Sequence, residues 1–465
     1  MTNVPPPSVA GFDADLVRRY DVPAPRYTSY PTAAHFRAMT SDEHRQAVEA
    51  CVRARPDAPL SLYVHLPFCA SPCFYCGCTR VITRDRPRTT RYLQLLLHEI
   101  RLQSLAFGGT RPIEQLHLGG GTPTHFADEE LGELLECIRA RFGFAAQAQR
   151  EFSIEIDPRT VDPPRLERLA DLGFNRISLG VQDFDADVQA AVNRVQDRAR
   201  IAELVAAARC RGLRSVSFDL IYGLPRQTEA SFARTLDHAI AMRPDRLAIY
   251  GYAHLPSMFR AQRKIRLDDL PDAAQRLALL ALAIERLTQA GYVHLGLDHF
   301  ALPGDDLAIA FREGRMQRNF QGYSTRAGLD LLGVGMSAIS RLGDVYTQDE
   351  RVLAKWEARV AEEGIATARG IRLTDEDRRR ARIIEDILCG RDVRYSDHQA
   401  PDEDFRRRFA AELARLEGPR ADGLVELLPD RLHVTREGRF LLRVIAMAFD
   451  AWCGAAGALP HSRAA

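Results

Sequence analysis

Four of the chain's nine cysteines lie within ten consecutive residues, inside the stretch HLPFCASPCFYCGCTR (65–80). These four are Cys69, Cys73, Cys76 and Cys78, and the other five are scattered singly along the 465 residues. In a reducing compartment, so dense a group of thiols indicates metal binding or redox chemistry rather than a disulfide framework.

Three kinds of site use closely spaced cysteines. A structural zinc site is built from two well-separated pairs, whereas here all four thiols share one loop. A redox C-x2-C pair would use Cys73 and Cys76 but leaves Cys69 and Cys78 unexplained. The C-x3-C-x2-C spacing lets one loop hold three corners of an iron–sulfur cubane and leaves one iron open for a ligand. The spacing favours the cluster, and by itself it does not exclude Cys78 as a fourth ligand.

From about residue 60, short β-rich runs alternate with turns and helical stretches. The predicted strands are LSLYVHL (60–66), IEQLHLG (113–119), EFSIEID (151–157), NRISLGV (175–181), RSVSFDLI (214–221) and DRLAIYGY (245–252). Six successive βα units predict a parallel sheet with helices outside it. YVHLGLDHF (292–300) is a candidate for one further strand.

The residues with chemical potential follow the ends of these strands. In chain order they are the cysteine loop, GGGTP (119–123), Glu155 with Asp157, Gln182 with Asp183, Asp219 with YGLP, and YAHLP. In a βα barrel the carboxyl ends of the strands converge on one mouth, where active sites lie. The sequence therefore predicts a single large site built from all six strand ends.

The flanking segments differ in character. Residues 1–50 form an N-terminal arm with the aromatic stretch PRYTSYPTAAHF, residues 51–370 the barrel, and residues 371–465 a mostly helical, winged-helix-like domain. Within 301–370, FREGRMQRNFQGYST and the glycine-rich LDLLGVGMSAISRLG are interpreted as loops that close over the site. In the last segment, GLVELLPDRLHV predicts a hairpin, and Thr435 is the predicted N-cap of a following helix. A structural lid is favoured over DNA binding because no basic face accompanies this segment.

Charge and hydropathy exclude several classes of partner. Lys+Arg 63 against Asp+Glu 62 gives a net charge of +1, so nothing in the balance attracts nucleic acid or an anionic membrane. Lys264 and Lys355 are the only lysines, and the arginines that remain suit the recognition of carboxylates. The N-terminal MTNVPPPSVAGFDADL has no apolar signal-peptide region, and the most apolar helical stretch, RLALLALAIERLTQAGY, is charged at intervals. We expect a cytoplasmic protein with no membrane span.

The motifs and their order resemble one enzyme family. The stretches that carry the resemblance are YVHLPFC-x3-C-x-YCGC, HLGGGTPT, IEIDPR, GFNRISLGVQDF, VNRVQ, DLIYGLP, YAHLP and RNFQGY. Together they are similar to the oxygen-independent coproporphyrinogen III dehydrogenases, also called oxidases, of the radical S-adenosylmethionine (SAM) superfamily. The likeness runs from PRYTSYPTA to the final helices and implies an α/β fold, a partial (βα)6 TIM-like barrel.

The resemblance implies a [4Fe-4S] cluster bound by Cys69, Cys73 and Cys76, and two bound SAM molecules. Cys78 would sit near the cluster without ligating it, because a fourth thiolate would close the iron that SAM needs. The residues implied for the first SAM are Tyr63, Gly120, Glu155 and Ile339. Those implied for the second are Tyr75 through its main chain, Gly121, Thr122, Gln182, Arg194, Asp219 and Ala253. Gln321 is expected over the mouth.

Several of these residues also have plainer interpretations. The glycines of GGGTP suit close backbone approach to a ligand, but no Lys-Ser/Thr pair follows to make a P-loop. The pair Glu155 and Asp157 could indicate glycoside hydrolysis, although nothing else supports it. Tyr63 would otherwise be a barrel-lining aromatic. His65 and His254, which precede Leu-Pro turns, are expected to be structural.

The implied reaction is the oxidative decarboxylation of two propionates of coproporphyrinogen III to vinyl groups, giving protoporphyrinogen IX in haem biosynthesis. A propionate C–H bond is not acidic enough for a side-chain base, so a 5′-deoxyadenosyl radical from SAM must abstract the hydrogen. The family implies flavodoxin or ferredoxin as the electron donor and a monomeric protein.

Three other functions compete. Haem chaperones of the same superfamily share the three-cysteine loop but typically carry an aromatic residue where Cys78 stands, and they lack the PRYTSYPTA arm. A radical methyltransferase or haem-degrading relative is disfavoured by the set of motifs from IEIDPR to VNRVQ. A zinc-stabilised structural protein is the most distant alternative.

Overall fold

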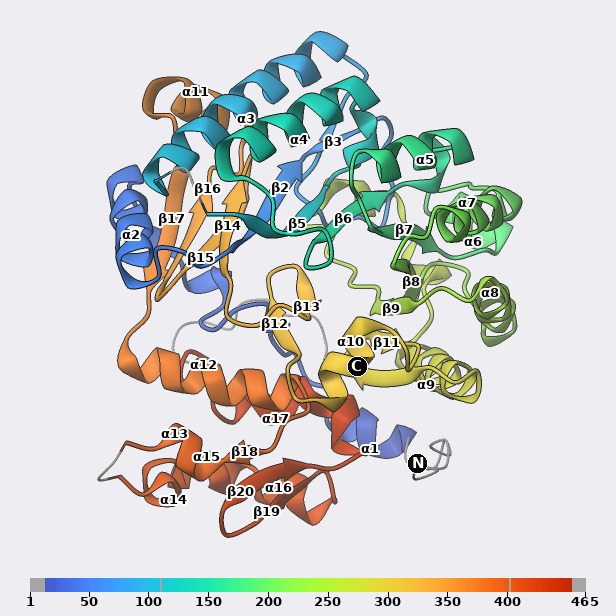
Figure 1. The fold of residues 1–465 in the computed structure, drawn as a ribbon. Helices are drawn as coiled ribbons and strands as arrows, with labels where there is room; N and C mark the ends of the chain where they lie inside the picture. Colours follow the sequence, from blue (N-terminus) through green and yellow to red (C-terminus); the bar gives the residue numbers. More distant parts are fainter. Residues whose placement is uncertain (1–12, 109–110, 401–402, 454–465) are drawn as a thin grey trace.

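The computed structural model describes residues 13–108, 111–400 and 403–453. A curved sheet with helices on its outer face forms the larger part, and a mostly helical C-terminal part packs below its open side (Figure 1). Residues 1–12, on which the expectation of no signal peptide rests, and the end of the C-terminal segment, 454–465, lie outside the described residues. No helix of the described residues is both long and apolar enough to cross a membrane.

The six predicted strands are confirmed, each within one residue at either end. They are β2 (Leu60–Leu66), β5 (Ile113–Gly120), β6 (Glu151–Ile156), β7 (Arg176–Gln182), β8 (Ser215–Tyr222) and β9 (Arg246–Gly251). They pair in parallel in this order. Strand β2 is buried along its length except at Tyr63, as expected for a strand covered on both faces.

Helices follow the strands and cover the outer face. They are α3 (Arg86–Ala106), α4 (Asp128–Phe142), α5 (Pro163–Asp171), α6 (Ala186–Ala191), α7 (Arg198–Cys210), α8 (Glu229–Met242) and α9 (Ala273–Gln289). Their ends are set locally. In α5, the Asp162 side chain accepts a hydrogen bond from the Arg165 N–H, and proline occupies the first helical position.

The sheet extends beyond the barrel to thirteen strands, in the order β1-β17-β16-β15-β14-β2-β5-β6-β7-β8-β9-β11-β10. The added strands are β1 (Arg37–Ala38), β10 (Val293–Gly296), β11 (His299–Ala301), β14 (Asp330–Val334), β15 (Ile339–Leu342), β16 (Val345–Asp349) and β17 (Thr367–Arg372). The run 292–300 thus gives two antiparallel strands in place of one.

The prediction that LDLLGVGMSAISRLG forms a loop over the site is wrong. Its residues form β14, which pairs in parallel with β2, and β15, which turns back antiparallel to it. Glycine here reflects close packing rather than a loop, because a Cβ at Gly333 would lie 2.5 Å from the Ile339 carbonyl oxygen. The other predicted loop, residues 311–325, begins in the last turn of α10 (Asp306–Arg312) and forms the hairpin of β12 (Gln317–Asn319) and β13 (Gly322–Ser324).

The C-terminal part consists of short helices around a three-stranded sheet. Its elements are α12 (Asp375–Leu388), β18 (Val393–Arg394), α13 (Tyr395–His398), α14 (Phe405–Arg408), α15 (Ala410–Arg415), α16 (Glu417–Ala421), β19 (Val425–Leu427), β20 (Arg431–Val434) and α17 (Leu442–Met447); α11 (Leu353–Glu363) precedes it. The predicted hairpin is confirmed as β19–β20. The Thr435 hydroxyl accepts a hydrogen bond from the Gly438 N–H at 3.1 Å, but a 3-10 turn precedes α17, so Thr435 is not its direct N-cap.

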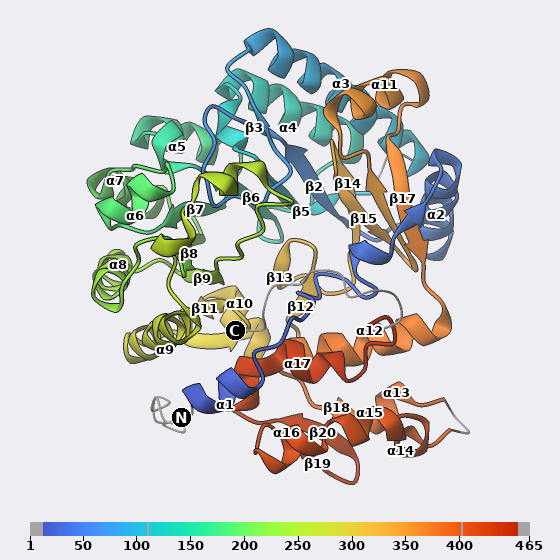
Figure 2. The ribbon, with the colours of Figure 1, turned by 180° about the vertical axis from the view of Figure 1, so that it is seen from behind.

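The N-terminal arm ties the two parts together. After α1 (Ala14–Arg19) it runs extended past β12 and α17 to β1 and then to α2 (Ser41–Ala54) (Figure 2). Tyr27 and Tyr30 of the arm are buried among apolar residues of α12 and α17. The Tyr27 hydroxyl donates a hydrogen bond to Asp450 Oδ2 at 2.9 Å.

Candidate active site

A cavity of approximately 750 Å³ opens at the carboxyl ends of the parallel strands. Most of the predicted site residues line it: Cys69, Cys73, Tyr75, Cys76, Cys78, Gly120, Gly121, Thr122, Glu155, Gln182, Arg194, Asp219 and Ala253. They come from loops and strand ends up to 184 positions apart in the sequence, between Cys69 and Ala253. Strand-end convergence therefore assembles one site, as the sequence predicts.

The cysteine loop leaves β2 and is fixed from two sides. The Arg80 guanidinium donates to the main-chain carbonyls of Cys73 at 3.2 Å and Cys76 at 3.0 Å. From the opposite side, the Gln262 amide donates to the Tyr75 carbonyl at 2.9 Å. Short strands β3 (Phe68–Cys69) and β4 (Val81–Ile82) close the base of the loop. The positions of the thiols are thus set by the protein itself.

The thiols lie among hydrogen-bond donors. Cys73 Sγ is 3.4 Å from Arg194 Nη1 and 3.6 Å from Arg159 Nη2, and Cys69 Sγ is 3.3 Å from the Thr122 hydroxyl. Hydrogen bonding with Cys78 lowers the pKa of Cys76 to about 6 against the opposing effect of burial. Donors and guanidinium charge suit thiolates, so the loop fits an anionic cluster of the iron–sulfur kind.

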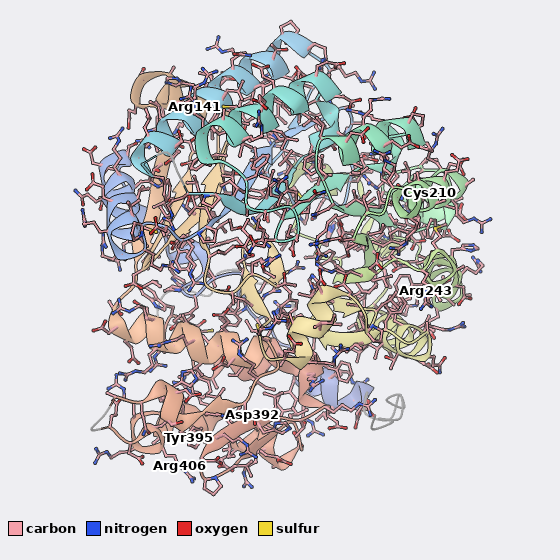
Figure 3. All side chains as sticks on the ribbon, viewed as in Figure 1. Arg141, Cys210, Arg243, Asp392, Tyr395 and Arg406 are labelled. Carbon is pink, nitrogen blue, oxygen red and sulfur yellow. The ribbon has the colours of Figure 1, made fainter. Side chains whose placement is uncertain are left out.

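In the described residues, no three His, Cys, Asp or Glu side chains are grouped so that they could hold one metal ion. The corners of a cubane are separate iron atoms, and each takes one cysteine, so its ligands need not converge on one point. The five scattered cysteines do not line the cavity. Figure 3 shows one of them, Cys210, on the outer helix α7, where it is exposed.

Glu155, the penultimate residue of β6, lines the cavity. Its carboxylate lies 3.1 Å from His117 Nε2 and accepts a hydrogen bond from the Gly120 N–H at 3.3 Å. Burial opposes its ionisation, yet the hydrogen bond and charge of His117 keep the pKa of Glu155 below its usual value. Tyr63 does not line the cavity. It stacks on His117, with ring centroids 5.9 Å apart, and its hydroxyl lies 2.9 Å from His65 Nδ1.

Arg194 is buried behind the cysteine loop. Its guanidinium contacts Asp157 Oδ2 at 3.2 Å and donates to the Gly180 carbonyl at 2.6 Å. Asp157 is also paired with Arg159 at 2.6 Å. In sequence alone, Arg194 would be interpreted as a solvated charge, but its side chain is only 8% exposed.

Gln182 and Asp219 occupy the neighbouring strand ends. Gln182 has a φ of 66°, and the register between β7 and β8 slips at this point, so the bulge redirects the strand end at the cavity. Asp219 accepts a hydrogen bond from the Ser178 hydroxyl at 3.0 Å. Burial, and then the charge of Glu155, raise the pKa of Asp219 to about 6.

Ile339 and Gln321 also do not line the cavity. Ile339 lies on β15 and packs against the apolar cluster of Phe36 and Tyr346. Gln321 lies in the turn of the β12–β13 hairpin. Both predicted structural histidines make ring contacts within the fold. His65 Nε2 lies 2.9 Å from the Thr79 carbonyl oxygen, and His254 Nδ1 lies 2.8 Å from the Tyr252 hydroxyl.

Sequence reasoning missed several lining residues, among them Arg26, Arg80, Arg159, Phe259 and Gln262. Arg26 and Arg159 belong to the motifs PRYTSYPTA and IEIDPR. These motifs indicated a functional stretch, but they did not show which of their residues would line the cavity. Nothing in the sequence around Gln262 marks it.

Comparison with known proteins places these features in a family. Residues 63–239 match the Radical SAM superfamily, and residues 373–441 match the HemN C-terminal domain. The chain is 45% identical over 441 residues to the oxygen-independent coproporphyrinogen III oxidase of Pseudomonas aeruginosa, covering 94% of this chain and 95% of that protein. It is likewise 45% identical over 442 residues to the enzyme of that name from Escherichia coli, covering 95% of each.

A solved structure agrees with this result. The coproporphyrinogen III oxidase HemN from Escherichia coli, described as a radical SAM enzyme, superimposes with a TM-score of 0.89 at 44% identity. The match covers 95% of this chain and 99% of that one, so it includes the barrel, the arm and the C-terminal part.

Proposed function

This chain belongs to the oxygen-independent coproporphyrinogen III oxidase family of radical SAM enzymes, and from that premise we propose how its own residues serve the reaction. The reaction is the oxidative decarboxylation of two propionates of coproporphyrinogen III to vinyl groups, which yields protoporphyrinogen IX in haem biosynthesis. The observation that carries the assignment of residues is the meeting of the cysteine loop with Glu155, Arg194 and Asp219 in one cavity.

Cys69, Cys73 and Cys76 hold the [4Fe-4S] cluster in this proposal, and Cys78 stays unligated beside it. The cluster and SAM, when bound, supply the one-electron chemistry that removes a hydrogen from an unactivated propionate carbon. The guanidinium groups of Arg194 and Arg159 next to Cys73 stabilise the negative charge of the thiolate ligands. The thiols need no large movement of the chain, because Arg80 already fixes the loop.

Glu155 and Gly120 would hold the first SAM. A carboxylate held ionised by His117 accepts hydrogen bonds from a ribose diol, and Gly120, with a φ of 115°, brings the main chain close to the ligand. Tyr63 and Ile339, which do not line the cavity, are proposed to support this side of the site from outside its lining. Tyr63 acts from behind, since its ring supports His117 rather than facing the cavity.

The second SAM lies towards β7, β8 and β9. Its proposed contacts are Gly121, Thr122, Gln182, Arg194, Asp219, Ala253 and the main chain of Tyr75. Arg194 suits a carboxylate, and an ionised Asp219 suits an ammonium group. Both groups therefore match the amino-acid end of such a ligand.

The remaining parts shield and supply the site. We propose that the arm (1–50) and the C-terminal domain (371–465) close the open side of the barrel (51–370) and exclude water, with Gln321 near the mouth. The chain is proposed to act as a monomer in the cytoplasm, where its nine unpaired cysteines stay reduced. Flavodoxin or ferredoxin is the proposed electron donor.

A strictly anaerobic assay on cluster-reconstituted protein tests the function. The mixture contains SAM, a reductant, an electron acceptor and coproporphyrinogen III, and chromatography follows the vinyl products and 5′-deoxyadenosine. Vinyl product that is lost in Cys73→Ser supports the proposal. Deoxyadenosine without vinyl product would reject this substrate, and tight haem binding without either product would favour the haem-chaperone alternative.

A further inference from the structure

A group of arginines lies where the N-terminal arm meets the hairpin β12–β13 and helix α17. Arg26, on the arm, lines the large cavity. The Arg318 Nη2 group, from the hairpin, donates to the Arg26 carbonyl at 3.3 Å. Arg443, from α17, donates to the carbonyls of Ala24 and Pro25. Three cationic side chains thus come together on one short piece of the arm.

The positive charge in this group exceeds the negative charge near it. Asp298 is the carboxylate that lies among these arginines, and it is already 2.6 Å from His299 Nδ1. Glu385 is also close, but it accepts from the main-chain N–H of Arg318, at 3.4 Å, rather than from its guanidinium. Burial, and then the charge of Arg26, lower the pKa of Arg443 to about 10, as expected where cations crowd together.

Two side chains of the hairpin β12–β13 carry buried donors that the described fold leaves unused. Among the described residues, Arg318 Nε and Nη1 are buried without a hydrogen-bond partner, and so is Gln321 Nε2 in the same hairpin. The Arg318 guanidinium is held in place by the face of the Tyr323 ring, 4.9 Å from its centroid. Arg318 lines a small pocket beside arm residues 27–30, next to Arg26, rather than the large cavity itself. Buried donors without partners destabilise a fold, so their presence next to Arg26 indicates an acceptor that arrives with a ligand.

Resting on the proposed function, we infer that Arg318 and Arg26 form the binding site for a propionate carboxylate of the substrate, with Gln321 as an additional donor. A guanidinium binds a carboxylate through charge-assisted hydrogen bonds, and Nε and Nη1 of Arg318 are donors that have no partner in the described fold. Arg26 lines the same cavity as Asp219 and Tyr250, so a carboxylate held here belongs to a molecule inside that cavity.

The arm acquires a direct role through this site. Its residues 24–26 are held by hydrogen bonds from Arg443 and Arg318, and a bound carboxylate adds a third connection through Arg26. Substrate binding should therefore hold the arm more firmly against the hairpin. Substrate binding should also protect the arm from proteolysis. This effect is not expected if Arg318 only stabilises the fold.

The test measures equilibrium binding of coproporphyrin III to the cluster-reconstituted protein by fluorescence, with its tetramethyl ester as a probe of the same ring without charges. Arg318→Gln and Arg26→Gln should each weaken binding of the tetra-acid by about tenfold or more, the value of a charge-assisted hydrogen bond. Neither substitution should change binding of the ester. In turnover, both should raise KM for coproporphyrinogen III more than they lower kcat.

Matched controls are Arg315→Gln beside the hairpin and Arg37→Gln on the arm, both exposed arginines that should bind the tetra-acid like wild type. Arg318→Lys keeps the charge and is the substitute if Arg318→Gln does not fold. Its affinity for the tetra-acid should lie between those of Arg318→Gln and wild type. Unchanged affinity in folded Arg318→Gln and Arg26→Gln, or an ester that binds wild type as tightly as the tetra-acid, overturns the inference. Wild type that forms no vinyl product instead refutes the proposed function, whatever the binding results.

Discussion

The cavity has two walls that handle charge in opposite ways. On the barrel wall, Arg194 meets Asp157, and Glu155 meets His117. We call residues 24–30, the hairpin β12–β13 and α17 the arm wall; of these, Arg26 is the described residue that lines the cavity itself. On this arm wall, the Arg318 guanidinium keeps two buried donors without a partner among the described residues. A wall that holds a resident cofactor benefits from fixed, paired groups, whereas a wall that receives an anionic substrate keeps donors in reserve. This difference underlies the proposal that the cofactor binds to the barrel wall and the substrate carboxylate to the arm wall.

The largest expected effect comes from removing a thiol of the barrel wall. Cys73→Ser should lower the rate of vinyl product formation by about 1,000-fold or more. Without cluster chemistry, the side chains of the cavity cannot abstract the propionate hydrogen. Iron content and visible absorption of the reconstituted protein should fall in parallel with activity.

The matched control is Cys210→Ser, on the outer helix α7, which should keep wild-type iron content and activity. Binding of coproporphyrin III to Cys73→Ser should also persist, because the arm wall is intact. Loss of porphyrin binding together with iron would contradict the division of the cavity into two walls.

The two walls should also differ in what their arginines do for stability. Arg194→Gln leaves the buried carboxylate of Asp157 with only Arg159 and should cost about 2–3 kcal/mol of unfolding free energy, somewhat less than breaking an isolated buried pair. Arg26 is exposed on the arm, so Arg26→Gln should change the free energy of unfolding by less than about 0.5 kcal/mol.

Urea unfolding of both variants without ligands measures this contrast. The double variant Asp157→Asn/Arg194→Gln should be less destabilised than the sum of its parts, which identifies the ion pair as the cause. Equal destabilisation by Arg194→Gln and Arg26→Gln would remove the basis of the comparison.

The barrel wall should bind its cationic ligand in a pH-dependent way. Asp219, whose pKa burial raises to about 6, attracts an ammonium group only when ionised, so affinity should fall as pH drops through about 6. Between pH 7 and pH 5 we expect about tenfold weaker binding of SAM to the site of Asp219. Equilibrium dialysis across this range measures it, and Asp219→Asn should flatten the profile. A profile that keeps its slope in Asp219→Asn would show that Asp219 is not the group responsible for the pH dependence.

The barrel and the cysteine loop were predictable because their signals are local. Parallel strands buried on both faces appear as apolar runs, and the C-x3-C-x2-C spacing belongs to one loop. The glycine-rich run from 329 to 343 was misjudged because a glycine in a turn and a glycine under a crossing carbonyl, like Gly333, look alike in sequence.

The arm wall could not be predicted because its contacts join distant segments. Arg26, Arg318 and Arg443 meet only in the folded chain, and in a sequence where nearly every basic residue is arginine, none of the three stands out. Tyr63 shows the same limit on the barrel wall. Its strand was predicted correctly, but its position behind His117 depends on the pairing of β2 with β5.

The smallest expected effect tests how the arm wall is held. The Tyr27 hydroxyl is the donor to Asp450 Oδ2 in a buried setting, so Tyr27→Phe should cost about 1–2 kcal/mol of unfolding free energy. Tyr20→Phe is the matched control, because its partner Asp422 is more exposed and keeps the hydrogen bonds from Arg19; it should cost less than about 0.5 kcal/mol. If the arm also positions Arg26, Tyr27→Phe should raise KM for coproporphyrinogen III by about two- to threefold, whereas Tyr20→Phe should not. A stability loss without any change in KM would mean that the arm is fixed at Arg26 by Arg318 and Arg443 alone.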